Sequence, residues 1–224
     1  MTQIGKNFLY FYYFYPINQS MPLYRDFSDD NATILVWKYE EGEDLNPDEL
    51  LESENAEKVK DYHPKKLLEV LMVRKLLKSL KPDSKILYKE REPFLSPKDA
   101  EISITHSFPF AAIAISKNKI GIDIEKFNPK ILRVIDKFTY ENERGFIPSD
   151  NEATFYTIIW SVKESMYKIH HSKHWSLKKH YEVKPFELKY LFDISCRVHD
   201  DKISDEFKAR VKFFDDYCFT IVEE

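Results

Sequence analysis

The sequence predicts an α+β protein whose two halves each combine one long helix with antiparallel strands. Helical periodicity of the apolar residues is clear over residues 64–81 and 152–171. Around both helices lie segments rich in β-branched and aromatic residues, joined by short turns that are typical of antiparallel pairing. The chain has 224 residues, of which 43% are hydrophobic and 32% charged, so it can bury a sizeable core and is neither fibrous nor low-complexity.

The first 20 residues differ from the rest because they lack a clear periodicity. The aromatic run at residues 8–15 is too short for a membrane span, and no small-residue cleavage site follows it. We expect either a surface extension with an aromatic anchor or a translation start at Met21, and we favour the start at Met21. The expected organisation is an extension over 1–20, an N-terminal half over 21–118 and a C-terminal half over 119–224.

The N-terminal half begins with a predicted strand at residues 33–39. An acidic segment follows, with a short helix beginning near Asn46, because Pro47 suits the first position of a helix. The long helix over 64–81 begins at a proline and is stopped by Pro82, and its apolar side chains face a core.

The second part of this half is predicted to be strand. Short strand and turn material over 85–95 leads to an alternating strand at 101–105. Residues 110–116 are almost entirely apolar, which indicates a strand buried on both faces. Because Lys117-Asn118-Lys119 has the composition of a turn, we expect the strands on either side of it to form a hairpin or meander.

Residues 120–125, Ile-Gly-Ile-Asp-Ile-Glu, predict a strand with two different faces. Strand side chains alternate, so the isoleucines point one way while Gly121, Asp123 and Glu125 point the other. Two carboxylates about 7 Å apart on one stiff strand, beside a glycine that leaves room for a ligand, are suited to holding Mg²⁺ against a phosphate. The alternative is a half-exposed strand whose acids are merely solvated.

The C-terminal half contains the second long helix. Residues 129–146 are expected to be helical and to precede it. In the helix over 152–171, Trp160, Glu164 and Lys168 recur every four residues, away from the apolar stripe. On this pattern alone, Glu164 and Lys168 could equally form an ordinary surface ion pair.

The tail is predicted to be all strand and turn. Strands are expected at about 186–194, 207–214 and 217–222, with Asp215-Asp216 as the turn of the last hairpin. Cys196 and Cys218 are too few for a disulfide framework, so we expect free thiols in a reducing cytoplasm.

Charge is unevenly distributed along the chain. The formal net charge of −4 argues against a nucleic-acid-binding protein, and no apolar run is long enough to span a membrane. Residues 58–81 nevertheless hold eight Lys or Arg against two acids, and residues 163–184 hold six lysines against two acids. Such local patches indicate an anionic ligand or an acidic partner, although lysine-rich helix faces that are only solvated remain the alternative.

Three segments, taken together, resemble the signatures of the 4'-phosphopantetheinyl transferases. They are Ser103-Ile104-Thr105-His106-Ser107, then Gly121-Ile122-Asp123-Ile124-Glu125, then WSVKESMYK over 160–168, in the order and spacing of that family. The resemblance runs from about Ile34 to the C-terminus, and the chain length is similar to that of the surfactin-synthetase-activating type. That type has a pseudo-dimeric fold of two similar α/β halves in one chain, which we therefore expect here.

The resemblance implies a function. The family transfers the 4'-phosphopantetheine arm of coenzyme A to a serine of an apo carrier protein, with Mg²⁺, and releases 3',5'-ADP. The implied partner is an acidic acyl or peptidyl carrier of fatty-acid, polyketide or nonribosomal peptide synthesis, and the implied form is a cytoplasmic monomer. Attack of a serine on a pyrophosphate does require a metal to neutralise charge and a base to activate the hydroxyl.

The resemblance also implies roles for individual residues. Asp123, Glu125 and Glu164 would bind Mg²⁺, and Glu164, directly or through a water, would deprotonate the carrier serine. Lys168 would stabilise or protonate the leaving phosphate. Coenzyme A would be held by Lys168 together with a largely basic set: Thr105, His106, Lys58, Lys60, Lys65, Lys66 and Arg91.

The chain departs from the family pattern before the histidine motif. The family usually has Gly-Lys-Pro there, with the lysine contacting coenzyme A, whereas this chain has Arg91-Glu92-Pro93, which reverses the charge. Arg91 could compensate. The alternative function is therefore a catalytically degenerate homologue that binds coenzyme A or a carrier protein.

A second departure follows the catalytic lysine of the motif. The family often has glycines there, but this chain has a segment containing His170, His171 and His174. The spacing of His170 and His174 fits a metal site on a helix face, yet no acid or cysteine accompanies the pair in the sequence, so a loop is the preferred interpretation.

Overall fold

The structure, a computed structural model, describes residues 23–174, 176–189 and 191–224. The expected extension over residues 1–20 and the choice of Met21 as the start lie outside the described residues. Within the described part of the chain, no helix has the length and apolar character needed to cross a membrane.

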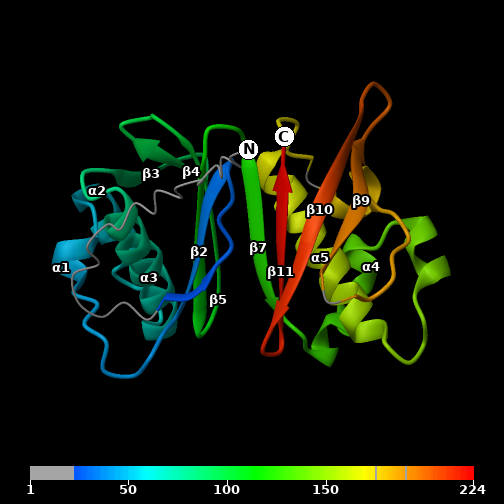
Figure 1. Ribbon diagram of the computed structural model, residues 1–224, viewed down its shortest axis with the longest axis horizontal. Coiled ribbons are helices and arrows are strands. Elements are labelled where there is room, and N and C mark those ends of the chain that lie inside the picture. The colour runs from blue at the N-terminus through cyan, green and yellow to red at the C-terminus, as the bar shows by residue number, and fades with distance from the viewer. Residues whose placement is uncertain (1–22, 175, 190) are drawn as a thin grey trace, which may run out of the picture.

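Two antiparallel sheets pack face to face between two long helices, which gives four layers (Figure 1). Helix α3 (Pro64–Leu80) covers the outer face of a four-stranded sheet, and α5 (Glu152–Ile169) covers the outer face of a five-stranded sheet. The predicted α+β class with antiparallel sheets is confirmed. Both long helices end within two residues of their predicted boundaries.

The four-stranded sheet is built from residues 23–116. Its strands, in spatial order, are β1 (Leu23–Asp26), β2 (Ala32–Lys38), β6 (Phe110–Ser116) and β5 (Glu101–Ser107). Alternate side chains of β2 divide between two cores: Ile34 and Val36 face the second sheet, while Leu35 and Trp37 face α3. This explains the unbroken apolar run of the central strands, which are covered on both sides.

Smaller elements complete the N-terminal half. Helix α1 (Pro47–Leu50) begins after Asn46, whose side chain caps it, as predicted. Helix α2 (Ser53–Val59) leads to α3, and a separate hairpin of β3 (Lys85–Lys89) and β4 (Glu92–Ser96) follows α3.

The five-stranded sheet is built from residues 120–223. Its spatial order is β7 (Ile120–Lys126), β11 (Tyr217–Glu223), β10 (Ser204–Phe214), β9 (Leu191–His199) and β8 (Tyr181–Val183), the last preceded by α6 (Leu177–His180). The turn at Asp215-Asp216 joins β10 to β11, as predicted. The first of the three expected tail strands, at about 186–194, corresponds to β9, which begins five residues later.

The expected hairpin or meander around residues 117–119 is wrong. Strand β6 pairs with β2 and β5, whereas β7 pairs with β11 in the other sheet. The three-residue connection therefore carries the chain from one layer to the next. Both sides of β6 are already hydrogen-bonded, to β2 and to β5, so β7 cannot pair with β6 and joins the other sheet. Whether the halves at 21–118 and 119–224 form two pseudo-symmetric domains stays a prediction.

The segment 129–146, which was expected to be helical, is helical only in three short pieces. This segment forms a 3₁₀ helix at Pro129–Arg133, a single α-helical turn, α4 (Ile135–Phe138), and a second 3₁₀ helix at Glu141–Phe146. A tertiary contact accounts for the break, because the fully buried Glu143 side chain accepts hydrogen bonds from Lys163 Nζ and from the Tyr140 N–H.

Gly121 allows α5 to lie directly on β7. A Cβ atom added at this position would lie 2.0 Å from the Ser165 carbonyl oxygen and 2.7 Å from Ile169 Cγ2. The glycine thus makes room for a helix, and the expectation that it leaves room for a ligand is wrong. Close helix-to-strand packing brings the residues of α5 to the carboxylate face of β7.

Candidate active site

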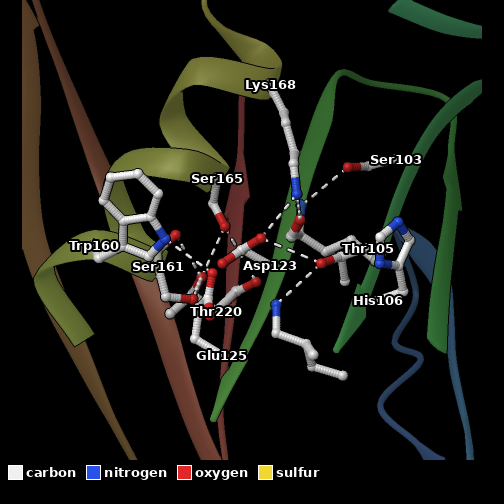
Figure 2. A network of polar contacts seen from close by, with 12 residues as sticks. Ser103, Thr105, His106, Asp123, Glu125, Trp160, Ser161, Ser165, Lys168 and Thr220 are labelled. Atoms are coloured by element: carbon white, nitrogen blue, oxygen red, sulfur yellow. Dashed lines mark hydrogen bonds and ion pairs between the residues drawn. The ribbon is translucent and has the colours of Figure 1, made fainter. Parts of the chain in front are cut away.

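The polar side chains of the three motifs meet where β5, β7 and α5 come together (Figure 2). Strands β5 and β7 are edge strands of different sheets. Ser103 Oγ accepts a hydrogen bond from the Ile122 N–H at 3.0 Å, and Thr105 Oγ1 accepts one from the Ile124 N–H at 3.2 Å. Hydroxyl side chains of β5 therefore satisfy the free backbone donors of β7, in place of a ladder between the two sheets.

Asp123 lies at the centre of this site and is 5% exposed. Its Oδ1 accepts hydrogen bonds from Lys168 Nζ at 2.9 Å and from Thr105 Oγ1 at 3.2 Å. Its Oδ2 is buried and has no hydrogen-bond partner among the described residues. The acids of β7 are thus not merely solvated, and one buried carboxylate oxygen has its lone pairs unused.

Glu125 is the second carboxylate on this face. Trp160 Nε1 donates a hydrogen bond to Glu125 Oε1 at 2.8 Å, which holds the side chain against α5. Burial raises the pKa of Glu125 to about 7, with a further contribution from the negative charge of Asp123. The Trp160 hydrogen bond opposes this increase. The site therefore holds a carboxyl group that has difficulty ionising without a nearby cation.

Glu164 is the third carboxylate, and α5 supplies it one helical turn before Lys168. Burial raises the pKa of Glu164, the charge of Asp123 raises it further, and the ammonium of Lys168 lowers it. Lys168 Nζ also donates to the Ile122 carbonyl oxygen at 2.7 Å. The ion pair of Lys168 with Asp123 shows that the Glu164–Lys168 pattern is not an ordinary surface pair, because the lysine pairs across to β7.

A hydroxyl cluster fixes the position of α5 next to these groups (Figure 2). Thr220 of β11 lies opposite Asp123 in the sheet. Its Oγ1 is 2.9 Å from Ser161 Oγ and 2.7 Å from Ser165 Oγ, and it donates to the Ser161 carbonyl oxygen at 3.0 Å. All three residues are buried, so the cluster sets which side of α5 faces β7.

His106 lies at the end of β5, between two side chains of α3. Its Nδ1 is 3.1 Å from Glu69 Oε2, and Lys66 Nζ is 2.8 Å from its Nε2. Because an ammonium can only donate, Nε2 is the acceptor and Nδ1 carries the proton. Burial lowers the pKa of His106, and the charges of Lys66 and Lys168 lower it further, against the effect of Glu69. The imidazole is therefore neutral near pH 7.

A cavity of about 560 Å³ opens beside the carboxylates, between the two halves of the chain. Glu164 and Lys168 line it from α5. Its other basic lining residues come from loops and strand ends: Arg91, Lys98, Lys119 and Lys173. Glu92 lies among them, and Lys173 Nζ is 3.5 Å from Glu92 Oε1. A cationic cavity of this size suits a large anionic ligand.

The predicted site residues are only partly brought together. Asp123, Glu125, Lys168 and Thr105 belong to one network with Trp160, and Arg91 lines the cavity with Glu164 and Lys168. Lys66 contacts His106.

Three predicted lysines lie apart from this network. Lys60 pairs with Glu57 on the surface at the end of α2, and Lys65 lies over the Phe108 ring, 4.6 Å from its centroid. Neither these residues nor Lys58 lines the cavity, and their role stays a prediction.

Sequence reasoning missed four residues of this region. Lys98, Lys119 and Lys173 stand in turns, where a lysine has no distinguishing pattern. Trp160 was part of a motif, but nothing in its spacing indicated a hydrogen bond to Glu125, which is 35 positions away.

The comparison with known families addresses this part of the chain directly. Residues 119–222 match the family model described as the 4'-phosphopantetheinyl transferase superfamily. Just under half of the chain is therefore similar to that superfamily. The match includes β7 and α5, and hence Asp123, Glu125, Glu164 and Lys168.

Three individual 4'-phosphopantetheinyl transferases are also similar to parts of the chain. The chain is 31% identical over 117 residues to the 4'-phosphopantetheinyl transferase gsp of Aneurinibacillus migulanus, covering 49% of each protein. It is 33% identical over 73 residues to the 4'-phosphopantetheinyl transferases ffp and Sfp of Bacillus subtilis, which covers 31% of this chain and 33% of each relative. The matched region thus spans half or less of the length of these phosphopantetheinyl transferases.

Proposed function

We propose that this protein transfers the 4'-phosphopantetheine arm of coenzyme A to a serine hydroxyl of an apo carrier protein and releases 3',5'-ADP. The observation that supports it best is the meeting of Asp123, Glu125, Glu164 and Lys168 beside one cationic cavity. The similarity of residues 119–222 to the superfamily favours this reaction over other reactions of pyrophosphates. The buried free thiols fit a cytoplasmic protein, and we infer that it acts as a monomer.

The donor set is suited to Mg²⁺. Asp123 Oδ2 is buried without a partner, and the pKa values of Glu125 and Glu164 are raised, so a cation would relieve the mutual repulsion. Within the described part of the chain, the oxygens of these three carboxylates do not all lie within 4.8 Å of one another. Mg²⁺ usually binds through one or two carboxylates with waters and substrate phosphates, so a spread set fits it. When bound, Mg²⁺ would neutralise charge on the pyrophosphate.

Glu164, Lys168 and His106 have different roles in the proposed reaction. Glu164 accepts the proton of the carrier serine, and its raised pKa makes it a stronger base than an ordinary glutamate. The serine oxygen forms a bond to the phosphorus next to the pantetheine arm, and the bond from that phosphorus to 3',5'-ADP breaks. Lys168 stabilises the negative charge on the departing phosphate. His106, which is neutral, contributes a hydrogen bond to coenzyme A without adding charge.

The test is a mass measurement. The full chain is incubated with coenzyme A, Mg²⁺ and several apo carriers of the acyl and peptidyl classes, and each carrier is weighed by mass spectrometry. We expect at least one carrier to gain the mass of the phosphopantetheine arm. If no carrier gains mass while calorimetry detects coenzyme A binding, the degenerate binding protein replaces the transferase.

Glu92 provides a further prediction. We expect Glu92→Gln to lower the Kd for coenzyme A about three- to tenfold, because it removes a negative charge from a cavity that would hold phosphates. It also frees Lys173 from its ion pair. Titration calorimetry measures the change, and Glu90→Gln, at an exposed position in the neighbouring turn, is the control. An unchanged Kd would place the phosphates away from Glu92.

A further inference from the structure

Two histidines and an aspartate lie together at the C-terminal end of α5, and one of them, His171, lines the same cavity as Glu164. The ligand atoms of His170, His171 and Asp205 all lie within 4.8 Å of one another. The histidines follow α5 directly, and Asp205 comes from β10. The sequence offered no acid next to the histidines, and the fold supplies one from 35 positions away.

His170 is the fixed member of this cluster. It is 1% exposed, and its Nε2 lies 2.9 Å from Asp205 Oδ2. On the other side of the ring, Nδ1 lies 2.6 Å from Ser172 Oγ. The ring edge also packs against Phe207, with a centroid distance of 6.0 Å. The imidazole is therefore held in one orientation, with the Ser172 hydroxyl next to Nδ1 and the Asp205 carboxylate next to Nε2.

His171 takes no part in the hydrogen bond that joins the end of α5 to β10. A hydrogen bond from His170 to Asp205 is enough to tie the end of α5 to β10. His171 is exposed, yet its ring centroid lies 4.5 Å from that of His170, which brings a second imidazole to the same carboxylate. The exposed side of the cluster therefore has a third possible metal ligand, the His171 imidazole, and is open to solvent.

We propose that His170, His171 and Asp205 bind Zn²⁺ or a similar divalent transition metal. Two imidazoles and one carboxylate, with the fourth position open to water, are a usual zinc donor set. Tetrahedral ligands with bonds of about 2.0–2.1 Å lie about 3.4 Å apart, so the 2.9 Å pair needs only a small widening.

Metal binding would change the hydrogen bonds on the other side of the His170 ring. Nδ1 accepts a hydrogen bond from the Ser172 N–H at 3.2 Å, which places the proton of the neutral ring on Nε2. With Nε2 as the ligand, that proton moves to Nδ1, the Ser172 N–H bond is given up, and Ser172 Oγ, 2.6 Å away, accepts from Nδ1 instead. Because His170 is two residues beyond Lys168, a bound metal would fix the end of α5 next to the transferase site. The proposal does not depend on the transferase activity.

Zinc binding to the full chain tests the proposal, with excess Mg²⁺ present to occupy oxygen-ligand sites. Equilibrium dialysis is expected to give one Zn²⁺ per chain. His171→Ala and Asp205→Asn are each expected to weaken zinc binding at least about tenfold, since even the loss of an outer-shell partner of a metal ligand costs 10- to 100-fold. Two variants serve as matched controls and are expected to keep zinc: His174→Ala, in the same loop, and Glu164→Gln, in the proposed magnesium site.

A measurement on the unmodified protein keeps the test independent of how the variants fold. In a zinc titration followed by NMR of the histidine ring nitrogens, the resonances of His170 and His171 are expected to shift together. The absence of zinc binding would overturn the proposal. So would zinc binding that persists in both ligand variants, or that is lost in Glu164→Gln alone.

Discussion

Replacing Glu164 by glutamine is expected to slow transfer to a carrier serine by at least about 100-fold, the lower end of what a general base contributes. The change keeps the size of the side chain and removes the group proposed to accept the serine proton. It also removes one of three mutually repelling carboxylates, so the free energy of unfolding should be unchanged or higher. Single-turnover assays with saturating coenzyme A and carrier measure the chemical step.

Glu152→Gln is the matched control, because Glu152 is exposed in the first turn of the same helix and is not in the site. It is expected to transfer the arm at the unmodified rate. Asp123→Asn, which weakens both the Lys168 ion pair and the proposed metal site, should be as inactive as Glu164→Gln. Full activity in Glu164→Gln would mean that another group, or water alone, accepts the serine proton.

Gly121→Ala is expected to lower the free energy of unfolding by about 3 kcal/mol, at the upper end of the cost of overpacking a core. The added methyl group would lie 2.0 Å from the backbone oxygen of Ser165, so α5 must move away from β7. A backbone atom cannot rotate out of the way as a side chain end can. The midpoint of urea unfolding, followed by circular dichroism, measures the loss.

Gly145→Ala is the comparison for this variant. A Cβ at Gly145 meets no atom within 4 Å, so this change should alter stability by less than about 1 kcal/mol. Transfer by Gly121→Ala is also expected to fall, because the displaced helix carries Glu164 and Lys168. Equal unfolding midpoints for the two alanine variants would show that α5 can adjust at little cost.

The elements that depend on local pattern were predicted well. Periodicity placed both long helices, with proline boundaries for the first, and alternation placed Asp123 and Glu125 on one face of β7. The pairing of β7 was missed because a three-residue connection suits a hairpin and a crossing between sheets equally. The helical character of 129–146 was predicted, but its division into three short pieces, the last of which carries the buried partner of Lys163, Glu143, was not.

The candidate site was likewise predicted only in part. Its acids and its lysine follow from motifs, each of which lies within a few residues of sequence. The contacts that orient them join residues far apart: Trp160 to Glu125, Thr105 to Asp123, and Lys173 to Glu92. The sequence around a hydroxyl or an indole side chain does not indicate which distant residue it will contact, so these contacts could not be predicted without the fold.

The contact between β5 and β7 has a mechanical consequence. Two hydroxyl groups, of Ser103 and Thr105, join the sheets here, instead of a continuous row of backbone hydrogen bonds. Separating the strands by a small distance breaks three side-chain hydrogen bonds, including that of Thr105 to Asp123, and leaves every ladder within each sheet intact. This joint is therefore easier to open than a backbone ladder, and it runs directly past Asp123. A ligand lying across it, held by both sides, would act as a brace between the two sheets.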